Sequence, residues 1–454
     1  KYRGQATKDN LFKLELDSKK FQLGALGQHI LNLSTMAMQR VNDTRNVDVE
    51  APLASDPLTG YTVRMGKVFK YGEPMGVFAQ TYSFLNPITR FNWGVSLMDD
   101  IAFNEKLTMK LGARYDLFST KDDRKGGAQN MGYIDYLLRN MQGAAMNFDP
   151  INDKESGFSF LGVVSYAHSQ LLNASYRFST GFRVPNTEEK YFQFYSAWPS
   201  FIVLSNRDLK AEKSYNHELE FNGRGKGFGY LLSLYYNQYS DFIELKQGTL
   251  AVKEPLMQTP KNISYVKNVN QTSAHLKGFD AALQLYPGEW VDLLKGFMVS
   301  SAFSYAEGSS SSGMSMLGIQ PLTGNIGVEY TDPKARWQVN IKANLYFAKP
   351  VSQTTFWDKD AAGKELIRRY PASFMSNAYT FDAYGYYKVT RNFTVRLGIY
   401  NILNSEYLRW DDLRQLTNPA LLSNINYFFQ DGKKSLSRFS RPKRYISLAL
   451  EYKI

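Results

Sequence analysis

Residues 106–117 read KLTMKLGARYDL. Every second residue in this stretch is apolar or aromatic, and the residues between them are polar, charged or glycine. The first set is Leu107, Met109, Leu111, Ala113, Tyr115 and Leu117, and the second is Thr108, Lys110, Gly112, Arg114 and Asp116. Because successive side chains of a β-strand point to opposite faces, this period of two predicts a strand with one apolar face and one charged face.

The same alternation recurs at residues 337–345, 393–400 and 445–454. These segments of about ten residues exceed the usual globular strand of about 5–6 residues, and they match the 9–11 residues that cross a bilayer at a tilt. We therefore expect one face of each strand to contact lipid. For the last strand the lipid-facing set is Ile446, Leu448, Leu450, Tyr452 and Ile454, and the lumen-facing set is Ser447, Glu451 and Lys453.

The predicted connections alternate between short and long. Short turns are predicted at 167–170, 224–227, 331–334 and 390–392, and long loops at 119–156, 183–213, 246–274, 307–322, 348–378 and 403–440. Outer-membrane barrels have short turns at one rim and long external loops at the other. The sequence predicts an all-β fold, a transmembrane antiparallel β-barrel of about sixteen strands, with a β-sandwich as the alternative.

Composition supports this class and excludes others. The 454 residues contain 31 Tyr and 30 Phe but no Cys, which excludes disulfide scaffolds, thiolate metal sites and cysteine nucleophiles. There is no run of about 18 apolar residues for a transmembrane helix. The net charge of +12 is spread through the strands, which disfavours nucleic-acid binding and favours an anionic ligand or lipid. The first residues, KYRGQATKDN, lack a signal peptide, so we expect a mature chain, a cytosolic one or a fragment.

One predicted loop is unusually aromatic. Residues 179–214 read STGFRVPNTEEKYFQFYSAWPSFIVLSNRDLKAEKS. Large exposed apolar areas usually mark binding sites, so we expect an external docking surface here, with Phe192 and Trp198 as its main anchors. The full predicted set is Tyr191, Phe192, Phe194, Tyr195, Trp198 and Phe201.

Several motifs resemble those of the TonB-dependent outer-membrane receptors. Residues 182–185 (FRVP) and 206–212 (NRDLKAE) are similar to two successive boxes of that family's haem receptors, and residues 276–280 (LKGFD) resemble a strand-entry pattern. Residues 400–404 (YNILN), Tyr407 and residues 410–414 (WDDLR) resemble the haemoglobin, transferrin and lactoferrin receptor branch. The likeness covers residues 93–454, whereas residues 1–92 carry no such motif.

The resemblance implies a barrel of 22 strands with an N-terminal plug domain. We expect residues 1–454 to be one outer-membrane barrel domain, a C-terminal fragment without the plug and the first strands. An open sheet would expose two unpaired edges, which a bilayer does not tolerate, so the intact protein must close it.

The resemblance also implies a function. We expect a receptor that binds a host haem or iron carrier, with haemoglobin or haemoglobin–haptoglobin favoured, and imports the haem or iron with energy from TonB. A transferrin or lactoferrin receptor, a siderophore or zinc receptor and a passive porin are the alternatives. No Gly-x-Ser-x-Gly or His-Glu-x-x-His motif is present, so we expect neither an enzyme nor a permanently bound cofactor.

Candidate ligand residues are few, and no metal site is predicted. Residues 186–205 contain no histidine, although haem receptors of the family often have one there. Tyr191 and Tyr195 are possible tyrosinate ligands of haem iron. Arg183 is expected to anchor the loop to a lumen carboxylate or to contact a haem propionate. The histidines have structural interpretations: His168 in a short turn, His217 in an aromatic girdle, and His29 and His275 without visible partners.

Overall fold

A computed structural model gives the conformation of most of the chain. It describes residues 2–50, 61–64, 67–70, 78–82, 88–122, 141–144, 150–197, 200–253, 259–359, 365–370, 376–415 and 440–453. No helix in these ranges is long and apolar enough to span a membrane.

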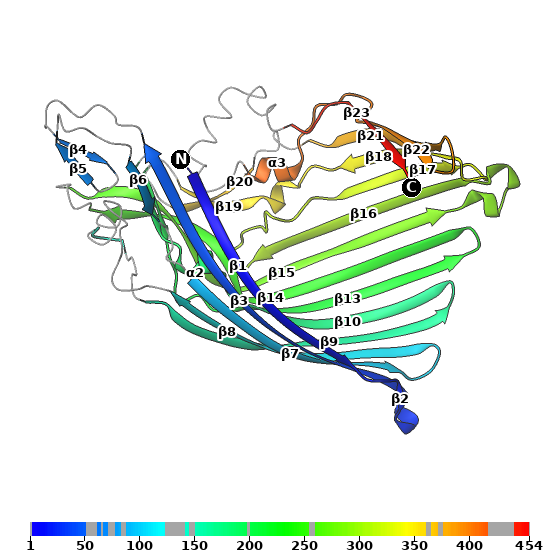
Figure 1. Ribbon diagram of the computed structural model, residues 1–454, viewed down its shortest axis with the longest axis horizontal. Helices are drawn as coiled ribbons and strands as arrows, with labels where there is room; N and C mark the ends of the chain where they lie inside the picture. The colour runs from blue at the N-terminus through cyan, green and yellow to red at the C-terminus, as the bar shows by residue number, and fades with distance from the viewer. Residues whose placement is uncertain are drawn as a thin grey trace.

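A single large sheet forms the wall of the molecule (Figure 1). Its long strands are β1 (Tyr2–Asp17), β3 (Gln28–Glu50), β7 (Ile88–Ala102), β8 (Leu107–Asp122), β9 (Asn152–Ser169), β10 (Leu172–Arg183), β13 (Glu212–Gly225), β14 (Phe228–Val252), β15 (Lys261–Leu285), β16 (Phe297–Ser310), β17 (Thr323–Thr331), β18 (Trp337–Tyr346), β21 (Ala378–Lys388), β22 (Phe393–Tyr400) and β23 (Tyr445–Tyr452). They pair in this order as an antiparallel meander, which confirms the predicted fold class.

Short elements complete the architecture. β2 (Phe21–Gln22), β6 (Phe78–Tyr82), β11 (Phe194–Ala197) and β12 (Ser200–Leu204) bring the sheet to 19 strands, against the predicted number of about sixteen. Two separate hairpins are β4 (Tyr61–Arg64) with β5 (Lys67–Lys70) and β19 (Thr355–Lys359) with β20 (Glu365–Arg369). The helices are α2 (Thr187–Tyr191), α3 (Trp410–Gln415) and the 3-10 turns η1 (Gly24–Leu26), η2 (Pro287–Glu289), η3 (Asp292–Leu294) and η4 (Val351–Gln353).

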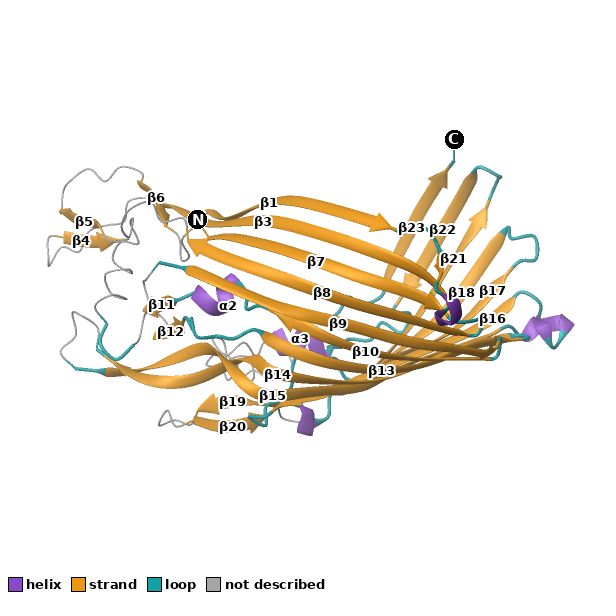
Figure 2. Cartoon of the chain, turned by 90° about the horizontal axis from the view of Figure 1, so that it is seen from below, coloured by secondary structure: helices purple, strands orange, loops and turns teal. Residues whose placement is uncertain are grey.

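The sheet curves into an open trough (Figure 2). Among the described strands, β1 pairs only with β3 and β23 pairs only with β22, so each presents one unpaired edge. The short turns β9–β10, β13–β14, β17–β18 and β21–β22 lie at one rim, on the right of Figure 1. The connection from β14 to β15 and the ends of the loop between β10 and β13 lie at the opposite rim, as the sequence predicts, whereas most of the predicted loops 119–156 and 403–440 lies outside the described residues.

The two faces of the wall differ in polarity. In β9, Phe158 and Phe160 are 62% and 51% exposed on the outer face, although both are large and apolar. Asp153 and Glu155 point to the inner face, where they contact Lys190 of α2. Exposed apolar side chains on the outside and ionised groups on the inside are the arrangement of a membrane barrel wall.

The last strand follows the same rule. Ile446, Leu448, Leu450 and Tyr452 are 64–69% exposed and pair with apolar residues of β22. Glu451 lies on the other face and accepts a hydrogen bond of 2.9 Å from Arg396. The prediction for this strand is therefore confirmed, except for Ile454, which lies outside the described residues.

Exchanging an outer apolar side chain for a charge tests this assignment. Ile341 lies near the middle of β18 on the outer face. Because an uncompensated lysine near the bilayer midplane costs about 2–4 kcal/mol, Ile341→Lys is expected to lower the folded fraction in vesicles, measured by heat-modifiable gel migration. Ser304→Lys on the inner face of β16 is the control and is expected to fold normally. Equal folding of both variants would contradict the face assignment.

Several predicted loops contain regular structure: the 348–378 segment contains η4, β19 and β20, and the 403–440 segment contains α3. The 246–274 segment is mostly strand, because β14 and β15 stay paired from Phe228 and Leu285 to Val252 and Lys261. The 183–213 segment contains α2, β11 and β12. Beyond the membrane both faces of a strand meet water, so the apolar alternation fades while the backbone hydrogen bonds continue.

Candidate functional site

The ends of the aromatic loop meet at the rim of the wall. β10 ends at Arg183 and β13 begins at Glu212, and these two residues are directly paired across the strands. The 28 residues between them leave the wall and return to the adjacent strand. Both sequence boxes, 182–185 and 206–212, lie at this point.

Arg183 holds the two ends of the loop together. Its Nε donates to Glu212 Oε2 at 2.5 Å, and its Nη1 donates to Glu189 Oε2 at 2.8 Å. Glu212 Oε1 also accepts the backbone N–H of Ile243 in β14 at 2.6 Å. Glu212 therefore links β10, β13 and β14. This is the anchoring role that the sequence predicts for Arg183.

A capping box shapes the start of α2. The Asn186 side chain accepts the backbone N–H of Glu189 at 2.7 Å, and the Glu189 carboxylate accepts the backbone N–H of Asn186 at 2.8 Å. This reciprocal pair satisfies two backbone donors at the helix start. The Asn-x-x-Glu spacing after Pro185 is a visible signal that the sequence analysis missed.

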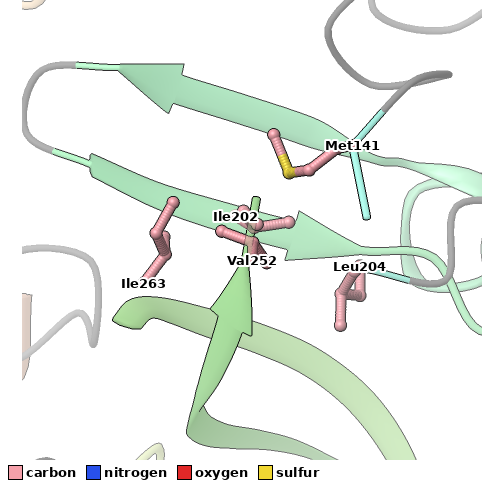
Figure 3. Packing of buried hydrophobic residues seen from close by; sticks show 5 residues of the cluster. All are labelled: Met141, Ile202, Leu204, Val252 and Ile263. Atoms are coloured by element: carbon pink, nitrogen blue, oxygen red, sulfur yellow. The ribbon is translucent and has the colours of Figure 1, made fainter. Parts of the chain in front are cut away.

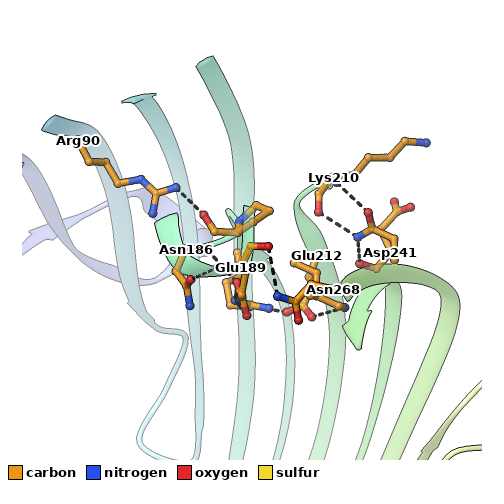
Figure 4. Close-up of polar contacts among 11 residues, drawn as sticks. Arg90, Asn186, Glu189, Lys210, Glu212, Asp241 and Asn268 are labelled. Carbon is orange, nitrogen blue, oxygen red and sulfur yellow. Dashed lines mark hydrogen bonds and ion pairs between the residues drawn. The ribbon is translucent and has the colours of Figure 1, made fainter. Parts of the chain in front are cut away.

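Asparagines of β15 fasten the loop to the wall (Figure 4). Asn268 Nδ2 donates to the backbone carbonyl of Glu189 at 3.2 Å. The backbone carbonyl of Asn268 accepts a hydrogen bond from Asn206 Nδ2 at 2.8 Å. Asn270 exchanges hydrogen bonds with the backbone of Lys210. We call Arg183, Asn186, Glu189, Glu212 and Asn268 the box junction, since they join both boxes to the wall.

Tyr191 lies beneath the loop. It is 7% exposed, packs with Ile88 and Ile151, and donates its hydroxyl to Asp153. Burial, together with Asp153, raises the pKa of Tyr191 far above its usual range. Its predicted docking and haem-ligand roles therefore have no support in this geometry, because a ligand must reach an exposed ring or a phenolate. The adjacent Lys190, which the sequence analysis did not single out, is also buried between Asp153 and Glu155.

The other predicted residues have different placements. Phe192 caps the end of α2 and Phe201 lies in β12, and both are half-buried. Phe194 and Tyr195 belong to β11, and Trp198 lies outside the described residues. The possible ligand role of Tyr195 and the docking role of the remaining aromatics stay predictions.

The loop has a small core of its own (Figure 3). Ile202 of β12 packs with Val252 and Ile263, the facing ends of β14 and β15, and Met141 and Leu204 complete the cluster. β12 also pairs in parallel with β15, with Ile202 opposite Tyr265. The hairpin β11–β12 is therefore packed against the extended β14–β15 pair, an arrangement that local alternation could not reveal.

The histidines lie away from this loop. His168 is beside the β9–β10 turn at the short-turn rim, and His217 lies on the outer face within hydrogen-bond distance of the Tyr176 hydroxyl, both as expected. His29 was expected to lack a partner, but its Nδ1 is 2.9 Å from Asp99, because β3 pairs with β7. In the described ranges no cluster of three His, Cys, Asp or Glu side chains could hold a metal ion.

A known family accounts for this combination of wall and loops. The family described as "TonB dependent receptor-like, beta-barrel" matches residues 3–402. This chain is a TonB-dependent receptor β-barrel. Members of the family are transport receptors of the outer membrane rather than enzymes, so this chain is an outer-membrane barrel as well.

Two relatives are similar over most of this receptor barrel. Hemoglobin and hemoglobin-haptoglobin-binding protein A of Haemophilus influenzae is 28% identical over 403 residues, covering 82% of this chain and 36% of that protein. Hemoglobin-haptoglobin utilization protein B of Neisseria meningitidis serogroup C is 28% identical over 379 residues, covering 77% of this chain and 42% of that protein. The receptor barrel thus spans less than half of each relative.

Solved structures show the same fold at low identity. The Serratia marcescens hemophore receptor HasR, as a double mutant with its hemophore HasA and heme, matches with a TM-score of 0.61 at 12% identity. The match covers 99% of the receptor barrel and 60% of that chain. The copper transporter OprC matches with a TM-score of 0.57 at 15% identity. The match covers 90% of the receptor barrel and 54% of that chain.

Proposed function

We propose that this chain is the barrel of a receptor that binds haemoglobin or haemoglobin–haptoglobin and imports haem or iron. The similarity to haemoglobin-binding receptors over 77–82% of the chain carries the proposal. The family's dependence on TonB supplies the energy source, and haem or iron is the transported ligand.

The box junction supports a binding role for the aromatic loop. A long loop that is free to move loses entropy when a partner orders it, and this weakens binding. Here Arg183, Glu189 and Glu212 fix both ends of the loop, and the core around Ile202 fixes the hairpin. The loop is therefore preorganised for a protein carrier.

Phe192, Phe194, Tyr195, Trp198 and Phe201 are the proposed docking residues. Aromatic anchors contribute about 2 kcal/mol or more each when they fill a partner's pocket. Phe192 and Phe201 are half-buried, so each combines a fixed ring position with some accessible surface. Arg183 contributes by positioning the loop, since its guanidinium is engaged by two carboxylates.

Carrier binding by the full-length receptor tests the proposal. The double variant Phe192→Ala/Trp198→Ala is expected to weaken haemoglobin binding severalfold or more in surface plasmon resonance, with surface expression unchanged. Leu293→Ala at the short-turn rim removes an exposed apolar side chain far from the loop and is the control. Failure of the unaltered receptor to bind haemoglobin or its haptoglobin complex, with transferrin bound instead, would overturn the carrier assignment. Unchanged haemoglobin affinity in the double variant would overturn the docking role alone.

A further inference from the structure

A second site lies around α3, away from the box junction. Trp410, the first residue of α3, is buried and donates its indole N–H to the carbonyl of Leu317 at 2.7 Å. Its ring meets that of Tyr370 edge-on at 5.3 Å. These contacts hold α3 over a cavity of about 20 Å³. The cavity is lined by Gln320, Pro321, Thr323, Tyr346, Phe347, Ala348, Lys349, Ser376, Leu408, Arg409 and Trp410.

Lys349 is the unusual residue in this cavity. It is 3% exposed, and among the described residues its ammonium group has one hydrogen bond, to the carbonyl of Ile319 at 2.7 Å. The Trp410 ring lies 5.4 Å from Nζ. No carboxylate of the described residues forms an ion pair with it. A buried ammonium without a counter-ion is costly, because the protein interior replaces its water only in part.

The described charges around Lys349 do not neutralise it directly. Burial lowers its pKa to about 8, and Glu307 opposes this shift only from a distance. Glu307 itself is engaged by Lys277, Tyr305 and Gln353. At pH 7 the ammonium form therefore still predominates.

Arg409 adds a second cation to the same cavity. Its guanidinium lies 5.0 Å from the centre of the Tyr346 ring and 3.8 Å from Asp411 Oδ2. Asp411 also accepts a hydrogen bond from Gln320. The lining thus holds two cations. Of the two described carboxylates beside Arg409, Asp411 is shared with Gln320, and Asp412 accepts the backbone N–H of Arg409 and pairs with Arg441.

We propose that Lys349 and Arg409 bind one compact monovalent anion, chloride or a carboxylate group, in this cavity. The volume exceeds the roughly 10–15 Å³ that one water-sized group requires. A water molecule would fill the space but leave the charge of Lys349 unbalanced. An anion accepts hydrogen bonds from Lys349 and also neutralises it, and this stabilises the packing of α3 on the ends of β17 and β18.

Thermal unfolding of the full-length receptor tests this site. Tm is measured in chloride, formate and gluconate salts of sodium at equal ionic strength, gluconate being too large for the cavity. Because a ligand that binds only the folded state raises Tm, the expected difference is about 2 °C or more in favour of chloride or formate. Whichever of chloride and formate gives the higher Tm shows whether the site prefers a halide or a carboxylate.

Variants separate this site from general salt effects. Lys349→Met is expected to abolish the difference between the anions, whereas Lys295→Met, at an exposed lysine of the short-turn rim, is expected to retain it. Bromide diffraction from crystals of the unaltered receptor gives a second measurement. It should show an anomalous peak within hydrogen-bond distance of Lys349 Nζ. Equal Tm in all three salts would overturn the proposal, even if Lys349→Met failed to fold, and an empty cavity in bromide would overturn chloride as the bound anion.

Discussion

Replacing Glu212 with alanine is expected to release the aromatic loop from the wall while the barrel stays folded. The substitution removes the acceptor of Arg183 and leaves the backbone N–H of Ile243 unpaired. Breaking a fully buried ion pair costs about 3–5 kcal/mol. Since the Arg183 side chain is 45% exposed and solvent screens it, we expect about 2–3 kcal/mol here, expressed as local opening of the loop.

Hydrogen exchange of residues 184–211 measures this opening, and about 2 kcal/mol corresponds to roughly 30-fold faster exchange. Glu218→Ala is the matched control, because Glu218 pairs with Arg177 on the same two strands but contacts no described residue of the loop. Glu212→Gln keeps an acceptor for Ile243 and should give a smaller effect. Similar exchange in Glu212→Ala and Glu218→Ala would contradict the anchoring role.

Ile202→Ala is expected to detach the β11–β12 hairpin from the β14–β15 pair. Ile202 is fully buried among Val252, Ile263 and Met141, and shortening such a side chain costs about 2–5 kcal/mol. The parallel pairing of residues 201–204 with residues 264–267 depends on this core. We therefore expect lost amide protection in β12 and, if the loop binds the carrier, weaker haemoglobin binding.

Ile367→Ala provides a control for this substitution. Ile367 has the same side chain but is exposed on the β19–β20 hairpin. It should change neither amide protection in β12 nor carrier affinity. Retained protection of residues 201–204 in Ile202→Ala would show that hydrogen bonding alone secures the hairpin.

The wall could be predicted from the sequence because its signal is local. A strand that crosses a bilayer has to alternate apolar and polar side chains, so the sequences of segments such as 106–117 and 445–452 show directly which residues lie on each face. The short turns could also be predicted, because they are the breaks between successive alternating segments. The extensions of β14 and β15 could not be predicted, because strands in water have no such constraint.

The candidate site was predicted less completely. The two boxes located Arg183 through their resemblance to family motifs, and its anchoring role agrees with the contacts to Glu189 and Glu212. The burial of Tyr191 could not be predicted, because the sequence alone does not distinguish an aromatic residue that packs in a core from one on a docking surface. Only the fold brings Asp153 to its hydroxyl and Asp99 to His29.

The length of the β14–β15 pair has a mechanical consequence. Each strand has 25 residues, whereas about ten suffice to cross the bilayer. At about 3.3 Å per residue the remaining roughly 15 residues extend some 50 Å. A large protein bound at the tip of this pair would lie well above the lipid headgroups. Its thermal motion would exert a force on the β14–β15 pair. Because the two strands stay paired from tip to wall except at Asp241, such a load would be carried along the strand pair to the box junction.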